Sequence, residues 1–496
     1  MDRAMPALVI VIPLLTAILT ALAGRWWRRH AWPAALLSTA FAAAGAIRIL
    51  WRTVHEGVVV YEMGGWPVPT GIPYRCDRLN GIVLTMVACV AFLAVLWMRR
   101  SVQREIRKAG QASYYAIVLL FTTGFLGITI TGDVFNLYVF LEIASITSYV
   151  LVAMGRRREG LFAGYQYLIL GSIGATFVLI GIGHLYMATG SLAMTDIQAL
   201  LSGALDQYPS VVHTSFAFIT VGLAIKMALF PLHSWQPGAY THAPSSASLL
   251  MAATATKVAA YAFYRFAFTV YGTDYVTARL PQVLDGVMIM AAAAMVVGPL
   301  FAVRQDNLKR MLAYSSVGQI GYVVLGATLA NESGMTGSIT HFWNHAASKG
   351  ALFAVAGVVV LRAGSPHIDN LRGMGRRAPW TAAAMTAAAL SLVGVPLTGG
   401  FVTKYYLAQG ALEAGHAVLL PFILVSSLLT AVYMWRCLQR VWFAEADVVP
   451  PVSREAPPTM RLATVVLGAA CLVFGIFAWI PVDIAAAAAR ALLGGS

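Results

Sequence analysis

Apolar segments separated by short polar connections recur along the whole chain. A helix of about 20 residues can cross the hydrocarbon core of a bilayer, and it satisfies its own backbone hydrogen bonds there. The pattern therefore predicts an all-α, polytopic membrane protein with about 14 transmembrane helices. The predicted helices cover residues 5–24, 32–50, 79–98, 113–131, 134–154, 163–188, 211–230, 245–268, 283–303, 312–330, 337–361, 378–395 with a broken continuation to 413, 417–440 and 460–480.

Two of these helices are interrupted by residues that disrupt helical backbone. The seventh breaks at Pro231, shortly after Lys226, and the twelfth breaks between Pro396 and Gly400. Proline removes a helical hydrogen bond, so such backbone is tolerated within a membrane only where it is buried in protein or lines a wet cavity. Because the breaks are five helices apart, they suggest two five-helix units of opposite orientation, as in transporters. No residue-level repeat accompanies them, so this symmetry is a hypothesis.

The breaks suggest four regions along the chain. Residues 1–110 are expected to form an N-terminal three-helix segment, and residues 111–270 the first repeat, with helices 4–8. Residues 271–441 would form the second, inverted repeat with helices 9–13, and residues 442–496 would contain the C-terminal helix.

Composition and charge agree with a membrane location. The chain is 59% hydrophobic and only 11% charged, whereas soluble domains are about 25% charged. A formal net charge of +14 could indicate nucleic-acid binding, but the basic residues cluster in alternate connections, such as Arg156 to Arg158 and Arg304 to Arg310. The positive-inside rule accounts for that distribution, and its constant phase over an even number of helices predicts both termini outside the cytoplasm.

Several ionisable side chains lie inside the predicted helices. A charge at mid-bilayer costs at least about 2.5–3.5 kcal/mol, so each is a functional candidate. Glu142 lies near the middle of the fifth helix, Lys226 just before the first break, and Lys257 well inside the eighth helix. The alternatives are a hydrogen-bonded packing carboxyl at Glu142 and lysines that extend their amines to a membrane interface.

The eleventh helix carries His341, His345 and Lys349 at spacings of four residues, which places them on one helical face. Such a row could relay protons, because histidine titrates near neutrality and a desolvated lysine can approach that range. A zinc site is a competing interpretation, but no third ligand with recognisable spacing accompanies the histidines. A structural role near the interface also stays open. Lys404, directly after the second break, is a candidate for a terminal proton exit or a cation site.

Five stretches together carry a family resemblance: Tyr61 to Trp66, Gly132 to Glu142, Ala224 to Trp235, His242 to Ser248 and Gly394 to Lys404. They resemble the D subunit of Mrp-type multisubunit Na⁺/H⁺ antiporters, which is similar to the antiporter-like, proton-pumping subunits of respiratory complex I. The resemblance implies fourteen helices, with helices 4–8 and 9–13 as inverted repeats. It also implies partner subunits in a hetero-oligomer, H⁺ and Na⁺ as the transported ions, and the cell membrane of a prokaryote.

The resemblance also implies roles for the candidate residues. Glu142 matches the essential glutamate of helix five, and it would form a charge pair with Lys226, the lysine of the first broken helix. Lys257 matches the lysine of helix eight. His341, His345 and Lys349 match the histidine and lysine series of helix eleven, and Lys404 matches the lysine of helix twelve. One departure is Gln166 before Tyr167, where relatives often carry a lysine, which puts a relay step at that point in doubt.

Three functions are compatible with these residues. The first is a proton-translocating subunit of a monovalent cation/H⁺ antiporter, in which buried Glu, Lys and His residues carry protons. The second is a proton-pumping subunit of a complex I-type or membrane-bound hydrogenase redox complex. The sequence has no haem, flavin or iron–sulfur motif, so we expect no cofactor and no metal in this chain, and any redox centre would belong to a partner. The third is a structural scaffold within such a complex.

Overall fold

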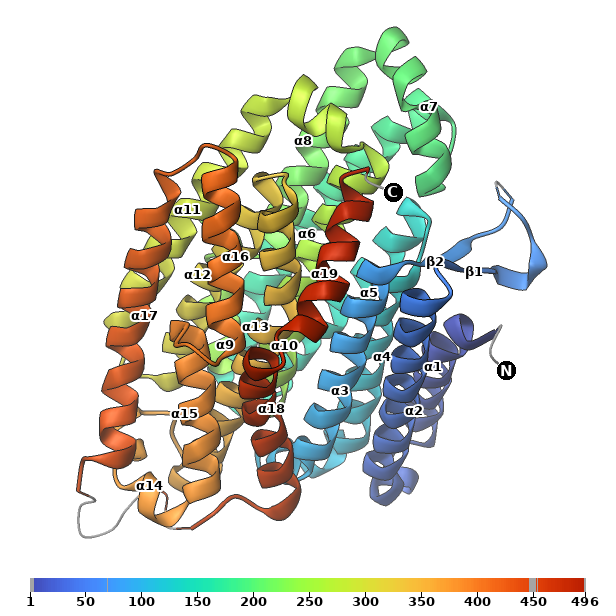
Figure 1. Cartoon of the computed structure of the whole chain (residues 1–496). Helices are drawn as coiled ribbons and strands as arrows, with labels where there is room; N and C mark the ends of the chain where they lie inside the picture. The colour runs from blue at the N-terminus through green and yellow to red at the C-terminus, as the bar shows by residue number, and fades with distance from the viewer. Residues whose placement is uncertain (1–3, 69, 446–451, 453, 495–496) are drawn as a thin grey trace.

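The computed structural model describes residues 4–68, 70–445, 452 and 454–494. Its long helices stand side by side in one bundle (Figure 1). Eleven helices in the described residues are long and apolar enough to cross a membrane. They are α1 (Met5–Ala23), α2 (Arg28–His55), α3 (Arg78–Glu105), α4 (Gln111–Ile130), α5 (Val134–Ala153), α6 (Arg158–Thr189), α8 (Pro209–Lys226), α11 (Pro281–Val303), α13 (Glu332–Ala363), α17 (Leu419–Trp442) and α18 (Pro458–Ile476).

The remaining crossings are more polar or are built from two pieces. Helices α10 (Ser245–Tyr264) and α12 (Leu308–Thr328) are continuous and deeply buried. The short helices α15 (Pro379–Val393) and α16 (Gly399–Glu413) follow one another as a single broken crossing (Figure 1). In the same way, α9 (Trp235–His242) continues α8 beyond the first break. The structure thus confirms the predicted polytopic helical fold and both predicted interruptions.

The two halves of the bundle have the same order of helices in opposite orientation. Helix α4 begins beside the basic connection that contains Lys108, whereas α11 ends beside the basic residue Arg304. In each half the fourth crossing is the broken one, α8–α9 in the first and α15–α16 in the second. The boundaries proposed from the sequence, 1–110, 111–270, 271–441 and 442–496, stay a prediction.

The structure adds elements that the sequence pattern did not indicate. A two-stranded antiparallel hairpin joins β1 (Val59–Glu62) to β2 (Pro73–Cys76) and projects from the bundle (Figure 1). Helix α7 (Met194–Gln207) forms a separate element between α6 and α8, and the one-turn helix α14 (Met374–Arg377) precedes α15. These pieces are too short or too polar to stand out among the membrane-length segments.

The last crossing is also broken, although we expected a single helix over 460–480. Helix α18 ends at Ile476, and α19 (Trp479–Leu492) carries the chain onward to the end that holds the C-terminus (Figure 1). Gly475 lies in the last turn of α18, beside the break. A Cβ at Gly475 would stand 2.3 Å from the carbonyl carbon of Thr398, so this turn packs directly against the second break.

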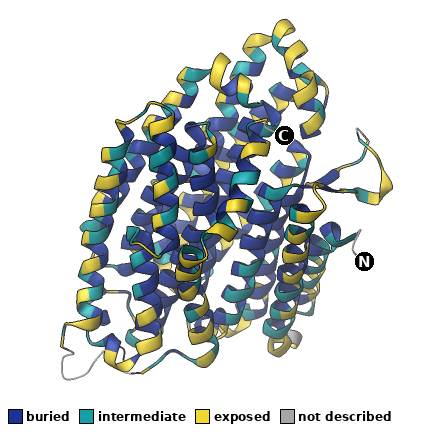
Figure 2. Cartoon of the chain, viewed as in Figure 1, coloured by how far each residue is buried: buried dark blue, intermediate teal, exposed yellow. Residues whose placement is uncertain are grey.

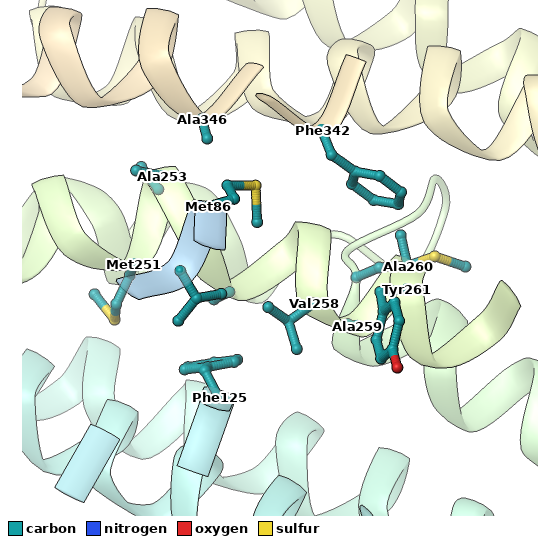
Figure 3. Close-up of a cluster of buried hydrophobic side chains, with 14 of the residues drawn as sticks. Met86, Phe125, Met251, Ala253, Val258, Ala259, Ala260, Tyr261, Phe342 and Ala346 are labelled. Carbon is teal, nitrogen blue, oxygen red and sulfur yellow. The ribbon is translucent and has the colours of Figure 1, made fainter. Parts of the chain in front are cut away.

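Burial is concentrated along the centre of the bundle, while exposed side chains lie mainly on outer helices and at the ends (Figure 2). Helix α10 forms part of this core, and all of its residues from Ser245 to Tyr264 are buried. Figure 3 shows apolar side chains of α10, such as Val258 and Ala259, between Phe125 of α4 and Phe342 of α13. Polar groups on α10 are therefore surrounded by tightly packed apolar side chains, away from bulk water.

Candidate functional site

The first break holds its backbone open through specific hydrogen bonds. Helix α8 ends at Lys226, and Ala228 then adopts a left-handed conformation with φ 57°. The indole of Trp235, at the start of α9, donates to the Ile225 carbonyl at 2.9 Å. That bond satisfies a backbone group which the end of the helix leaves without a helical partner. A left-handed alanine is a strained conformation that typically persists where surrounding structure enforces it.

The amine of Lys226 points from this break toward α5. Lys226 Nζ donates to Ser145 Oγ at 2.7 Å and to Tyr149 Oη at 3.4 Å, and it lies 3.5 Å from Glu142 Oε1. The Lys226 side chain is 7% exposed, whereas that of Glu142 is 29% exposed. The ion pair thus joins a deeply buried cation to a carboxylate that keeps some access to the surroundings.

Aromatic rings hold this pair in place from the side of α6. Tyr149 contacts Tyr167 edge to face, with ring centroids 4.6 Å apart, and Tyr167 stacks on Trp235 at 4.0 Å. A Cβ at Gly171 would lie 1.9 Å from the Tyr149 hydroxyl, so glycine is needed for this approach. Gln166, the position of the expected departure from the family, is exposed.

Lys257 lies alone in the centre of α10. It is fully buried, and its amine donates to the Ala252 carbonyl of its own helix. Within the described residues, no acidic side chain forms an ion pair with it. The position excludes the alternative in which this lysine extends to an interface, because none of its residue surface is exposed.

The row on α13 is buried as a unit. The rings of His341 and His345 stack with centroids 5.6 Å apart. His341 Nδ1 lies 3.1 Å from Thr403 Oγ1 of α16. Lys349 Nζ donates to the Leu312 carbonyl at 2.9 Å and to Ser315 Oγ at 2.7 Å, both on α12. The row therefore runs between the second broken crossing and α12.

Lys404 binds the backbone of the second break. Its amine donates to the carbonyls of Leu392 at 3.1 Å and Val393 at 2.7 Å, and to Ser427 Oγ at 2.9 Å. The two carbonyls belong to the last turn of α15, the negative end of that helix dipole. The Lys404 amine also lies 5.1 Å from the centroid of the Tyr322 ring. Leu397 is left-handed, with φ 68°, so this break repeats the backbone feature of the first.

Gly400 permits the two pieces of the second break to meet. A Cβ at this position would lie 1.7 Å from the Ser391 carbonyl oxygen. We expect Gly400→Ala to destabilise the protein by about 1–3 kcal/mol or more, because backbone on both sides would have to move. Gly183→Ala is a matched control, since a Cβ there meets no atom within 4 Å. Thermal unfolding of the detergent-purified complex measures both, and an equal melting temperature for the two variants would contradict the expectation.

Two further ionisable groups lie near the start of α12. Asp306 accepts from Arg436 of α17 at 2.9 Å, and the buried Lys309 amine donates to the Ala243 carbonyl at 2.5 Å. Lys309, at the start of α12, was not among the predicted site residues, and its position beside basic Arg310 gave no signal of burial.

No three His, Cys, Asp or Glu side chains in the described ranges come together as a metal ion would require. The stacked histidines are instead surrounded by Thr403, Tyr322 and their own helix. The site is thus a set of amines, imidazoles and one carboxylate, the groups that donate and accept protons.

The fold and the site together define a polytopic membrane subunit with inverted repeats, broken helices and buried ionisable residues. Comparisons with known proteins make the class specific. The family model described as NADH:quinone oxidoreductase/Mrp antiporter, TM matches residues 131–430. The chain belongs to this family of antiporter-like membrane subunits.

Three relatives illustrate the range of the family. NADH-quinone oxidoreductase subunit N of Desulforudis audaxviator is 40% identical, and the match covers 96% of each chain. The D subunit of the Na(+)/H(+) antiporter of Bacillus subtilis is 28% identical over 94% of this chain and 93% of that protein. A chain of the Mrp complex from Dietzia sp. superposes with a TM-score of 0.89 at 25% identity, covering 99% of this chain and 97% of that one.

Proposed function

We propose that this chain is a proton-translocating subunit of a multisubunit Na⁺/H⁺ antiporter. The observation that carries the proposal is the Glu142–Lys226 pair at the first break, in the same bundle as the buried amines and imidazoles of α10, α13 and α16. Isolated ionisable groups in a membrane are costly, and a series of them is typical of a proton relay. The name of the Bacillus subtilis relative, a Na(+)/H(+) antiporter subunit, supports sodium as the cation.

A small cavity lies beside the pair. Its volume is about 30 Å³, and its lining includes Lys226, Ser145 and the α10 residues Ala255 and Ala259. This volume is enough for one water molecule with polar partners. Lys257 is two residues from both Ala255 and Ala259, which places it on the opposite face of α10. A proton that leaves the pair therefore has space for a water at this face, and it has to pass around α10 to reach Lys257.

Further along the proposed route, several buried polar atoms have no hydrogen-bond partner among the residues that the structure describes. They include both ring nitrogens of His345, Nε2 of His341 and both amide atoms of Gln319. Buried polar groups are normally satisfied by protein or by ordered water. Such groups along α12 and α13 are the lining expected of a hydrated proton path between Lys257 and Lys404.

Coupling between the two halves follows from electrostatics. An amine in apolar surroundings keeps its proton most readily while a carboxylate lies near. When Glu142 and Lys226 are close, the lysine holds its proton; when they separate, the proton moves on toward Lys257. The basic connections would face the cytoplasm and both termini the outside, as the positive-inside rule requires.

Everted membrane vesicles containing the whole complex test the proposed function. With an imposed ΔpH, acid inside, we expect added Na⁺ to dissipate the gradient and added choline to leave it intact. The gradient would fall because Na⁺ enters the vesicles as protons leave them through this chain. A gradient that Na⁺ and other monovalent cations leave unchanged would contradict antiport.

A second candidate is a proton-pumping subunit of a redox-driven complex. The specific observation in its favour is the 40% identity to NADH-quinone oxidoreductase subunit N. The two candidates differ in their partners. Co-purification with subunits that carry flavin or iron–sulfur centres, and proton pumping that starts on addition of an electron donor, would favour the redox complex.

A further inference from the structure

A cavity of about 580 Å³ lies at the end of the bundle that carries the C-terminus. We call it the vestibule. Its walls come from the base of the hairpin, from α7, from the segment Arg265–Val270 that follows α10, and from the end of α19. The hairpin, α7 and the end of α19 lie toward the same end of the molecule (Figure 1). Its lining includes polar and charged residues: Thr53, Arg75, Gln198, Thr269 and Asp274.

An ion pair forms part of the vestibule lining. Arg265, just after α10, donates to both carboxylate oxygens of Asp77, at 2.7 and 2.5 Å. Its guanidinium also donates to Asn80 Oδ1 at 2.6 Å, to Thr269 Oγ1 at 3.2 Å and to Tyr261 Oη at 3.0 Å. All five donors of the guanidinium are thereby used. The pair therefore leaves no guanidinium N–H without an acceptor at the wall of the cavity.

Asp77 stays ionised in this position. Burial alone would raise the pKa of its carboxyl, but the Arg265 guanidinium and the Asn80 backbone N–H outweigh burial and hold the pKa below its usual range. The pair is therefore a true cation and anion at neutral pH, and separating its members would bring water to both.

A polar step leads from this pair toward the central lysine. The Tyr261 hydroxyl accepts from Arg265 and from Asn80 Nδ2, the latter at 2.8 Å, and lies 3.1 Å from the Thr129 carbonyl. Lys257 lies four residues before Tyr261 on α10, which places both on one face of that helix. In Figure 3 the ring of Tyr261 packs beside Ala259 and Ala260, and its oxygen points away from α13.

We propose that the Asp77–Arg265 pair is a gate between Lys257 and the outer aqueous phase, reached through the vestibule. The role of this gate in transport depends on the proposed function being correct. When the pair separates, water extends past Tyr261, and a proton leaves the Lys257 ammonium for that water while an equal charge leaves through the vestibule. Asp77 and Arg265 keep their own protonation throughout, and the pair then closes again.

Asp77 also has a structural role, and a substitution can separate that role from its charge. Its Oδ1 caps α3 by accepting from the Asn80 backbone N–H at 3.0 Å. Asparagine caps helices as well as aspartate does, so Asp77→Asn keeps the cap and removes the charge. The double variant Asp77→Asn/Arg265→Gln also removes the cation that the single change would leave without its partner.

Cysteine labelling in intact cells tests the gate without relying on transport. Cys76, Cys89, Cys437 and Cys471 are first replaced by alanine, and single cysteines are placed at Thr269 in the vestibule wall or at Tyr261 beneath the pair. The membrane-impermeant reagent methanethiosulfonate ethyltrimethylammonium is then added outside. We expect rapid modification at position 269 in every background. At position 261 we expect at least tenfold faster modification with Asp77→Asn, or with the double variant, than with the native pair.

Equal rates at position 261 with and without the pair would overturn the gate, as would labelling of position 269 only from the cytoplasmic side of everted vesicles. Transport supplies a separate measurement. We expect the double variant to reduce Na⁺-driven dissipation of ΔpH at least fivefold, and Arg436→Gln, which breaks the exposed Asp306–Arg436 pair, to leave it unchanged. If the native complex shows no exchange while position 261 opens as expected, the proposed function fails and the gate stands.

Discussion

We expect Glu142→Gln to lower Na⁺-dependent proton exchange in everted vesicles at least about tenfold while the complex still assembles. The substitution keeps the shape of the side chain and removes the charge that lies 3.5 Å from the Lys226 amine. Removing one member of a buried ion pair costs about 3–5 kcal/mol. Because Glu142 is partly exposed, we take about a third of that cost. A change of this size in the barrier to proton transfer corresponds to about tenfold in rate. The initial rate of ΔpH dissipation after Na⁺ addition is the measurement.

The matched control is Glu413→Gln, which changes an exposed carboxylate at the end of α16 in the same way. Its exchange rate is expected to equal that of the native chain. Lys226→Ala should fail as Glu142→Gln does, since either change removes the pair. Full exchange in either pair variant, with normal assembly, would rule out the proposed mechanism and favour the scaffold interpretation.

Lys257→Met separates function from stability. Lys257 is fully buried, and in the described part of the chain it has no acidic partner. A buried amine without an acidic partner bears the free-energy cost of leaving water, and an apolar side chain of similar volume removes that cost. We therefore expect the melting temperature of the purified complex to stay level or rise, while exchange falls at least about tenfold because the central proton carrier is lost.

Lys108→Met serves as the control for Lys257→Met, because Lys108 is exposed in a basic connection. It should change neither exchange nor the melting temperature. A large loss of stability in Lys257→Met would mean that the lysine has a structural role in α10. Native exchange in that variant would show that protons bypass α10 altogether.

Much of the fold was accessible from the chain alone, because membrane crossing is a local property. A run of apolar residues must be helical in lipid whatever lies beside it. Proline and the glycine pair likewise disturb the backbone locally, so both predicted breaks were found at Pro231 and between Pro396 and Gly400. The third break, after Ile476, was missed because residues 460–480 form one apolar run, and the close packing of Gly475 against Thr398 involves a distant part of the chain.

The candidate site divides in the same way. The cost of charge in a bilayer singled out Glu142, Lys226 and Lys257 from the sequence, and their roles in proton transfer stay predictions. The partners of these residues could not be derived from spacing. Ser145 and Tyr149 contact the Lys226 amine only because α5 and α8 pack together. Nothing in the local sequence of α5 marks them as its partners. Helices buried on nearly all sides, such as α10, also carry no clear apolar stripe that would indicate their orientation.

By itself, the sequence determined that this protein crosses a membrane many times, where its helices break and which charges enter the bilayer. These properties depend on the free energy of placing each segment in lipid. Only the tertiary structure decided which charges meet. Asp77 and Arg265 are 188 residues apart in the sequence, and Glu142 and Lys226 are 84 apart. Such pairs form because helix packing brings their side chains together where the low dielectric constant strengthens the attraction between opposite charges.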